Sequence, residues 1–547
     1  MALLLLPLLL FNLFLPQLED VLALPTPSDY DFTYMRSVYD ASDLPLGEEY
    51  EYIIVGGGTA GCSLAATLSE KYKVLVLERG TVPAAYPQVL DVDGSLRFLI
   101  QVDDGYTPAQ KFKSEDGVPS ARGRILGGSS MINMGFYSRA EEEFYRKSGV
   151  QWDMSLVEKA YQWVEETVAF HSDLSDWQST AKEAMLQAGV GPDNGYKLDH
   201  IVGTKAGASI FDEQGRRHGA VELLNRGQPN NLRVAVHATV DRIIFSSNPS
   251  SLSAMGVIYT DSKGKTHKAL VRDPGEVILS AGAIGTPQLL LLNGIGPVSD
   301  LSSLQIPVVH ANPYVGKFMA DNPRNTISII APKPLNTSYV QVVGITQDYY
   351  IETLSAKVPS SLLPPSLAFL STIFPLDVSV ATIGEKIPGP LSSGSLKLSS
   401  QADVRDTPVV RFNYFEDPQD LAGCVSGMRK IGDVLKTSSM ERFKFRGFGG
   451  ILEGFVYFGV PLPVNASDDL AMEVFCRNTV ETFWHYHGGC VVGKVVDGDL
   501  KVMGVNALRV VDGSVFNRSP GTNPQATVMM LGRYMGLKML QQRSQSN

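Results

Sequence analysis

Near the start of the chain, an apolar strand, a glycine turn and a helix follow one another, and this order constrains the fold more than any other feature. The apolar run 52–55 ends at a G-x-G-x-x-G turn, after which apolar residues recur at helical spacing. Gly56 permits the tight turn, Gly58 lets the backbone approach a pyrophosphate, and Gly61 lets the helix pack on the strand. The pattern predicts a doubly wound α/β domain that binds a dinucleotide.

A second apolar strand, 73–77, ends at Glu78, whose carboxylate can accept hydrogen bonds from an adenosine ribose. The alternative is a glycine-rich turn that binds no ligand. The candidate cofactor residues of this region are Gly56, Gly58, Thr59, Ala60, Gly61, Glu78 and Arg79.

The first fifteen residues are rich in leucine, but the run is too short and too interrupted to span a membrane. Val21-Leu22-Ala23 offers small residues at a cleavage site, so we expect residues 1–23 to be a secretory signal peptide. The alternative is a buried N-terminal helix. Export favours FAD over a nicotinamide, because an exported protein leaves behind the pool that recycles a soluble nicotinamide. No second fingerprint follows a strand, so we expect one FAD.

The length of 547 residues predicts at least two domains, because single cores stop growing near about 250–300 residues. The formal charge is 47 − 57 = −10 and no run of Lys or Arg exists, which argues against nucleic acid as a partner. Secretion would permit disulfides among the four cysteines and N-glycosylation at the sequons of Asn336 and Asn465. We expect a secreted or vacuolar protein, with no membrane span.

Two longer motifs resemble the signatures of the glucose-methanol-choline (GMC) flavoprotein family. The first is 122–133, with the turn Gly127-Gly128-Ser129-Ser130, and the second is 282–296, where Asn293 replaces the usual Ser. The segments 508–514 and 521–527 match the C-terminal flavin-contacting stretch of the family. The resemblance covers essentially the whole mature chain. It is greatest to the plant branch that holds the (R)-mandelonitrile lyases and their alcohol-oxidising relatives.

The resemblance implies an α/β flavin-binding domain, with a mostly parallel, doubly wound sheet, interleaved with an α+β substrate domain on an antiparallel sheet. It assigns 45–140, 200–300 and 500–545 to the flavin domain, and 141–199 and 301–499 to the substrate domain. It also implies a disulfide between Cys424 and Cys476 and a monomer. The flavin contacts that it adds are Gly127, Gly128, Ser129, Asn133, Val240, Trp484, Asp512, Gly513, Asn523, Pro524 and Gln525.

We expect the FAD to be noncovalent, because no His or Cys lies beside the first signature. In the substrate domain, 394–398 and 409–414 alternate apolar and polar residues as half-buried antiparallel strands do. The proline-rich segment 358–390 is expected to be a loop over the active-site entrance, or else a disordered surface insertion.

Two histidines stand two residues apart in Trp484-His485-Tyr486-His487, a spacing that could suggest a metal. No further His or Cys pair with metal spacing accompanies them, so we expect no metal site. The GMC pattern selects His485 as the catalytic base and leaves His487 a structural role. A neutral imidazole can take the hydroxyl proton of an alcohol while hydride passes to the flavin.

Asn523 would orient the substrate oxygen in this reading, and it could also cap the final helix. The leading expectation is therefore FAD-dependent oxidation of a small aryl or aliphatic alcohol. The alternative is a hydroxynitrile lyase, which cleaves a cyanohydrin without redox. Three departures count against the lyase: Asn523 replaces a second histidine, Phe483 replaces a tyrosine, and the substrate domain lacks the cysteine of the lyases. A secreted flavoprotein without turnover is the remaining class.

Overall fold

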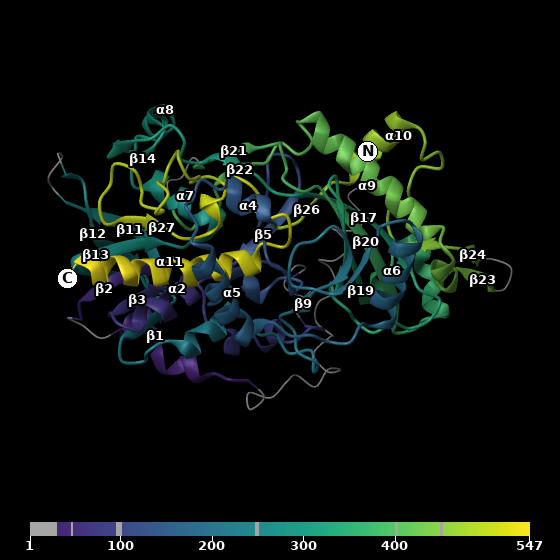
Figure 1. The fold of residues 1–547 in the computed structure, drawn as a ribbon, viewed down its shortest axis with the longest axis horizontal. Helices are drawn as coiled ribbons and strands as arrows, with labels where there is room; N and C mark the ends of the chain where they lie inside the picture. Colours follow the sequence, from purple (N-terminus) through teal and green to yellow (C-terminus); the bar gives the residue numbers. More distant parts are fainter. Residues whose placement is uncertain are drawn as a thin grey trace.

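The computed structural model describes residues 30–44, 48–94, 101–246, 251–399, 403–448 and 452–546. Two large sheets occupy opposite halves of the molecule (Figure 1). The expected signal peptide, 1–23, lies outside the described residues.

The first sheet has eight strands in the order β1-β10-β3-β2-β13-β12-β11, with β27 also paired to β13. The strands from β1 to β13, and β27, run parallel, whereas β12 and β11 are antiparallel additions. Their bounds are β1 Val38–Asp40, β2 Tyr50–Val55, β3 Val74–Leu77, β10 Leu232–Val236, β11 Thr239–Phe245, β12 Ala254–Thr260, β13 Thr266–Leu279 and β27 Leu508–Val510. The predicted strand, turn and helix at the fingerprint are confirmed as β2 and α2.

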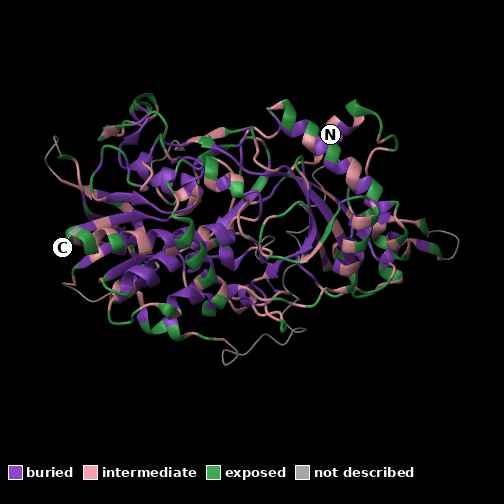
Figure 2. Ribbon diagram, in the orientation of Figure 1, coloured by how far each residue is buried: buried purple, intermediate pink, exposed green. Residues whose placement is uncertain are grey.

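Helices α2 (Thr59–Ser69) and α11 (Gln525–Ser546) pack against each other beside this sheet, and α5 (Met154–Val168) packs on α11 (Figure 1). Nearly all of α2 is buried, because its residues are small or apolar on every side and the hydroxyls of Ser63, Thr67 and Ser69 donate to backbone carbonyls. The central strands of both sheets are largely buried as well (Figure 2). The other helices on this side are α4 Glu142–Lys147, α7 Gly282–Leu292 and α8 Val298–Ser303.

The second sheet also has eight strands, in the order β25-β17-β20-β19-β18-β8-β7, with β26 paired to β17. All pairs are antiparallel except β7 with β8. Helices α6 (Asp176–Gln187) and α9 (Pro418–Leu435) pack on this sheet. The strand bounds are β7 Asp193–Tyr196, β8 Gly203–Ala206, β17 Pro323–Ile330, β18 Val342–Ile345, β19 Tyr350–Pro359, β20 Asp377–Lys386, β25 Val456–Tyr457 and β26 Glu481–Thr482.

Smaller sheets join these halves. The predicted strands at 394–398 and 409–414 are present as β21 and β22, but they form a separate small sheet with β16. The bounds are β4 Ala109–Lys113, β5 Pro119–Gly123, β6 Phe136–Tyr137, β9 Ala208–Ser209, β14 Ile295–Gly296, β15 His310–Ala311, β16 Lys317–Met319, β21 Gly394–Lys397, β22 Val409–Arg411, β23 Phe445–Phe448 and β24 Leu452–Gly454.

The expectation of a loop at 358–390 is wrong. This segment contains the end of β19, two short 3₁₀ helices and the ten-residue strand β20, at the centre of the second sheet. Its prolines lie outside β20, at the end of β19 and in the connections, where no strand pairing is lost. Two edges of the expected domains also differ: β8 pairs within the second sheet, and α5 packs on α11 of the flavin side.

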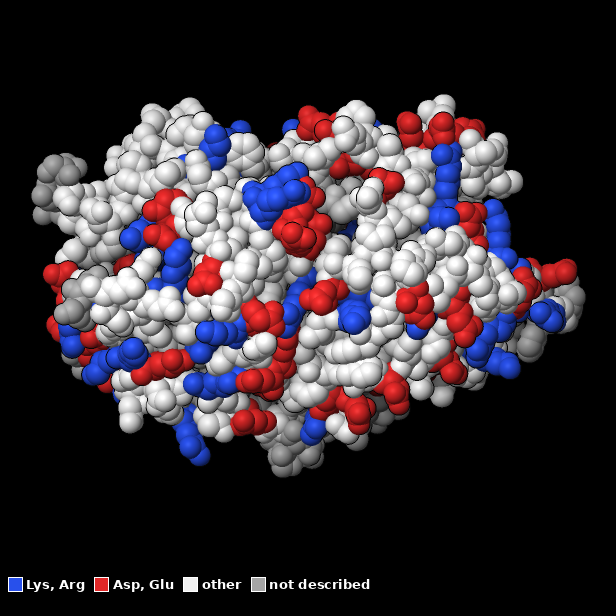
Figure 3. Space-filling model, in the orientation of Figure 1, with Lys and Arg blue, Asp and Glu red and all other residues white. Residues whose placement is uncertain are grey.

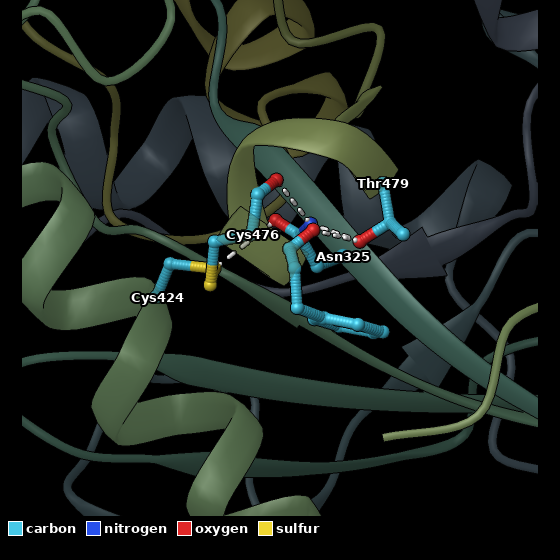
Figure 4. The surroundings of a disulfide bond; sticks show 5 residues. Asn325, Cys424, Cys476 and Thr479 are labelled. Carbon is cyan, nitrogen blue, oxygen red and sulfur yellow. Dashed lines mark hydrogen bonds between the residues drawn. A yellow bond between two sulfur atoms is a disulfide. The ribbon is translucent and has the colours of Figure 1, made fainter. Parts of the chain in front are cut away.

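The disulfide between Cys424 and Cys476 is confirmed, and it joins α9 to α10 (Asp469–Thr479) beside the second sheet (Figure 4). Asn325 of β17 donates hydrogen bonds to the Cys476 carbonyl (2.9 Å) and the Thr479 hydroxyl (2.8 Å), which ties α10 to the sheet. Cys62 and Cys490 are free thiols and are buried.

On the face drawn in Figure 3, acidic and basic side chains are interspersed, without an extended basic patch. None of the helices in the described part of the chain has the length and apolar character that a membrane span requires.

Candidate active site

A cavity of about 2100 Å³, including the part open to solvent, is lined by residues of both sheets. One end is lined by the glycine turn after β2, and the other contains side chains of β17 and β19. Sixteen predicted cofactor residues line it: Gly56, Gly58, Thr59, Ala60, Glu78, Arg79, Gly128, Ser129, Asn133, Val240, Trp484, Asp512, Gly513, Asn523, Pro524 and Gln525. His485 lines it too.

The glycine turn forms a cradle for an anion. Helix α2 begins directly after it, and no side chain caps the free amides of its first turn. The Cα of Gly58 faces Gly128 of the first signature so closely that a Cβ on Gly128 would lie 2.7 Å from it. Two chain segments thus approach without side chains between them, which leaves their backbones open to a pyrophosphate.

Gly61 and Gly127 do not line the cavity, so a direct cofactor contact by either is not supported. A Cβ on Gly61 would lie 2.1 Å from the carbonyl oxygen of Gly56, so this glycine lets helix and turn pack. Gly127 has a left-handed backbone (φ 91°), and its amide donates to the Gly57 carbonyl at 2.7 Å. Both glycines therefore support the backbone of the glycine turn without lining the cavity themselves.

The Glu78 carboxylate accepts hydrogen bonds from the amides of Gly57 (3.0 Å) and Gly80 (2.8 Å). These bonds fix it at the end of β3, where it lines the cavity. Burial raises its pKa, while the amides and Arg79 oppose that rise. Each carboxylate oxygen retains a lone pair, as a ribose hydroxyl would require.

Hydrogen bonds join the separate motifs into one wall. Asn133 of the first signature donates to Gln525 at 2.8 Å, at the start of α11. Asp512 accepts bonds from the amide of Gly282 (2.9 Å) and the hydroxyl of Thr286 (2.5 Å), both in the second signature. Segments far apart in the sequence are thereby held around the same cavity.

The loop that carries His485 is anchored by Asp321, a buried residue just before β17. Oδ1 accepts from the amide of His485 (2.8 Å), and Oδ2 accepts from the Thr482 hydroxyl (2.7 Å). Oδ2 also accepts from the Tyr414 hydroxyl (2.6 Å) and the Phe483 amide (3.3 Å). One carboxylate thus fixes the loop on both sides of Trp484, whose backbone is left-handed (φ 58°).

His485 is held as a neutral imidazole. Burial lowers its pKa well below the ordinary value, and the positive charges of Lys386 and Arg324 and its neighbour His487 lower it further. Its Nδ1 is buried without a hydrogen-bond partner among the described residues. A neutral imidazole keeps a nitrogen lone pair that can accept a proton.

His487 bonds to its surroundings through the backbone. Its amide and carbonyl pair with Ala320 (2.9 Å each), and its Nδ1 lies 3.0 Å from the His485 carbonyl. These contacts agree with a structural role, although His487 also lines the cavity. Among the described residues, no group of three or more His, Cys, Asp or Glu is arranged to hold a metal ion.

Asn523 precedes α11 and lines the same cavity as His485. Its Oδ1 accepts a hydrogen bond from the Tyr350 hydroxyl at 3.3 Å, and its side chain opposes the rise that burial causes in the pKa of Glu352. With the carbonyl directed at Tyr350, the amide presents N–H donors and has no site for a proton.

Sequence motifs do not identify four residues at the substrate end of the cavity: Asp321, Arg324, Glu352 and Lys386. Arg324 and Glu352 line the cavity, Lys386 lies beneath the ring of Phe483, and Asp321 anchors the loop. The sequence offers one signal for such residues, which is a charged residue inside a largely apolar strand. Glu352 in β19 is an example.

The fold and the cavity define a flavoprotein-like oxidoreductase with separate nucleotide and substrate halves. Family models described as "GMC oxidoreductase" match residues 50–324 and 390–532, and the chain belongs to this family. It is 55% identical to "(R)-mandelonitrile lyase 1" of Prunus serotina, over 100% of this chain and 96% of that protein.

The chain is also 51% identical to "Sinalpyl alcohol oxidase Nec3" of Nesocodon mauritianus, over 98% of this chain and 97% of that one. A solved structure of formate oxidase superposes with a TM-score of 0.74 at 19% identity, covering 91% of this chain and 99% of the other. This last likeness shows the fold alone. The chain is an enzyme of the GMC family whose cofactor is FAD and whose substrate is a small molecule.

The residues present fit FAD. The uncapped start of α2 and the paired glycines can hold the pyrophosphate, and Glu78 can accept from the ribose. Asn133, Asp512 and Gln525 line the same cavity as His485 and would be available to contact the flavin ring system.

Proposed function

We propose that this enzyme oxidises a small alcohol to a carbonyl compound, with His485 as base and Asn523 as the residue that orients the substrate oxygen. FAD supplies the hydride acceptor. The observation that carries the proposal is the pairing of a neutral, buried histidine with an amide at the same end of one cavity. His485 takes the hydroxyl proton, and an Asn523 N–H holds the oxygen while its charge develops.

The lyase is kept as a second candidate, because relatives with that name are 55% identical over the whole chain. Cyanohydrin cleavage also begins with removal of a hydroxyl proton, which His485 alone can do. It then needs donors for the leaving cyanide. Phe483 offers no hydroxyl there and Asn523 takes no proton, which favours oxidation.

We also propose that the chain is exported. Its support is the leucine-rich start, the disulfide, and the exposure of the sequon residues Asn336 and Asn465. Enzymatic removal of N-glycans from protein purified from its own tissue should lower its mass; an unchanged mass would contradict glycosylation.

Variants of the two proposed residues test the function. In Asn523→Ala, loss of the orienting bond should slow anaerobic flavin reduction by about one to two orders of magnitude. His485→Ala should cost more, about 10²–10⁴-fold, because the base is lost. His267→Ala is the matched control, since His267 pairs with Asp261 in the β12–β13 hairpin and does not line the cavity.

The lyase predicts a different pattern. Asn523→His would then raise cyanide release from mandelonitrile, because it supplies a second base. Flavin reduction by His485→Ala at the wild-type rate would refute the role of His485.

A further inference from the structure

Three charged residues lie on neighbouring strands at the substrate end of the cavity. Arg324 of β17 pairs across the sheet with Lys386 of β20, and Lys386 pairs with Tyr350 of β19. Glu352 is two residues beyond Tyr350, so both side chains project from the same face of the sheet. Its cross-strand neighbour is Gly384, which has no side chain to contact the carboxylate.

Lys386 supports the negative charge of Glu352. Its ammonium group is fully buried, 4.3 Å from the centre of the Tyr350 ring and 5.3 Å from that of Phe483. It has no hydrogen-bond partner among the described residues, so its charge acts on the carboxylate through space. Burial raises the pKa of Glu352 to about 7, and Lys386, Asn523 and Arg324 limit that rise.

One oxygen of the Glu352 carboxylate lacks a hydrogen-bond partner in the described part of the chain. The residue is 8% exposed, lines the cavity, and leaves Oε1 buried without a hydrogen-bond partner in the described structure. Buried carboxylate oxygens are normally satisfied, because an unpaired one is costly. Oε1 itself is enclosed, so a donor on the ligand reaches it when the side chain shifts toward the cavity that Glu352 lines.

The residues around Glu352 indicate which kind of hydrogen-bond donor the ligand would present to it. Val340, Leu354, Phe483 and Trp484 line the cavity with Glu352 and suit an apolar or aromatic ligand body. Two cations nearby, Arg324 and Lys386, disfavour a ligand ammonium group. A neutral hydroxyl meets both conditions.

We propose that Glu352 accepts a hydrogen bond from a second hydroxyl group of the substrate, so that the pocket selects hydroxylated alcohols over alcohols without that group. The inference rests on the proposed function for its substrate class. Recognition of the hydroxyl itself does not depend on turnover. Sites built to bond a substrate hydroxyl reject analogues that lack it.

The kinetic test compares each of the three hydroxybenzyl alcohols with its methoxy counterpart, using the holoenzyme. For at least one isomer, wild type should favour the hydroxyl compound by about 10- to 100-fold in kcat/KM, the range expected for a bond to a charged acceptor. Glu352→Gln replaces the charged acceptor with a neutral carbonyl, so this ratio should fall by about tenfold. If the substitution also disturbs Asn523, both substrates lose activity to the same extent, and the ratio of their kcat/KM values is unaffected.

Matched variants separate recognition from general damage. Glu481→Gln removes an exposed partner of Arg324 (2.8 Å) outside the cavity and should leave the ratio unchanged. If Glu352→Gln fails to retain flavin, Glu352→Asp takes its place, and its shorter reach should lower the ratio.

A binding test keeps the inference apart from the oxidation. Phenol and anisole are titrated into holoenzyme while the flavin spectrum is followed. Tighter binding of phenol, weakened in Glu352→Gln, supports the proposal even if no alcohol reduces the flavin. Equal affinities in wild type, or an unchanged preference in the variant, would overturn it.

Discussion

Replacing Asp321 tests whether one buried carboxylate positions the catalytic loop. Asp321→Ala leaves the amides of Phe483 and His485 without their acceptor. Each stranded buried amide costs about 1–3 kcal/mol, so the variant should lose about 2–6 kcal/mol of stability. The hydroxyls of Thr482 and Tyr414 can rotate to other partners and add less.

Asp321→Asn is the matched comparison because it keeps the shape. Its carbonyl can still accept from the His485 amide, and its NH₂ can donate to both hydroxyls, so only the 3.3 Å bond from Phe483 and the charge are lost. A loss of about 1–2 kcal/mol is expected.

Urea unfolding and anaerobic flavin reduction provide the assays. Asp321→Ala should reduce flavin about 100-fold more slowly, the scale expected for a displaced catalytic group, and Asp321→Asn less than about tenfold. A fully flavin-loaded Asp321→Ala with wild-type stability and rate would refute the anchoring role.

The same residue gives a pH dependence. Burial raises the pKa of Asp321 from 3.8 to about 6, so the folded chain binds its proton more tightly than the unfolded chain. Stability from this group is complete below about pH 4 and is lost as pH rises through about 6. The stability of wild type relative to Asp321→Asn should thus fall over that range, by about 3 kcal/mol. A difference that is independent of pH would contradict it.

Three further outcomes concern the cofactor and the cysteines. Gly58→Val should lower the flavin content of purified protein, because its side chain would enter the space beside Gly128; full occupancy would count against the cradle. Acid denaturation should release yellow FAD into the supernatant, whereas colour in the precipitate would indicate a covalent link. Thiol titration after unfolding without reductant should find two groups, Cys62 and Cys490, and four would exclude the disulfide.

Local patterns in the sequence predict the nucleotide half well. The strand, turn and helix at Gly56 are fixed by neighbours in sequence, and the structure places them as expected. The prolines of 358–390 predict a loop, whereas pairing with β17 and β19 makes 377–386 a strand. Tertiary pairing overrides local composition here.

In the candidate active site, too, the sequence identifies residues in local motifs but not residues that act through tertiary contacts. His485 and Asn523 lie within motifs, so the sequence identifies them. Asp321 bonds to His485, 164 residues away, and Glu352 meets Asn523, Lys386 and Arg324 from other elements, so only the fold brings these groups together. Gly127 appears in a motif, yet it supports the cavity from behind, a distinction that requires coordinates.

Anaerobic mixing of the holoenzyme with alcohols tests the central claim most directly. Benzyl and hydroxybenzyl alcohols should bleach the flavin absorbance, with one carbonyl product formed per flavin reduced. Mandelonitrile should release little cyanide under the same conditions. Rapid release of benzaldehyde and cyanide from mandelonitrile, with the flavin oxidised throughout and no alcohol able to reduce it, would contradict the account.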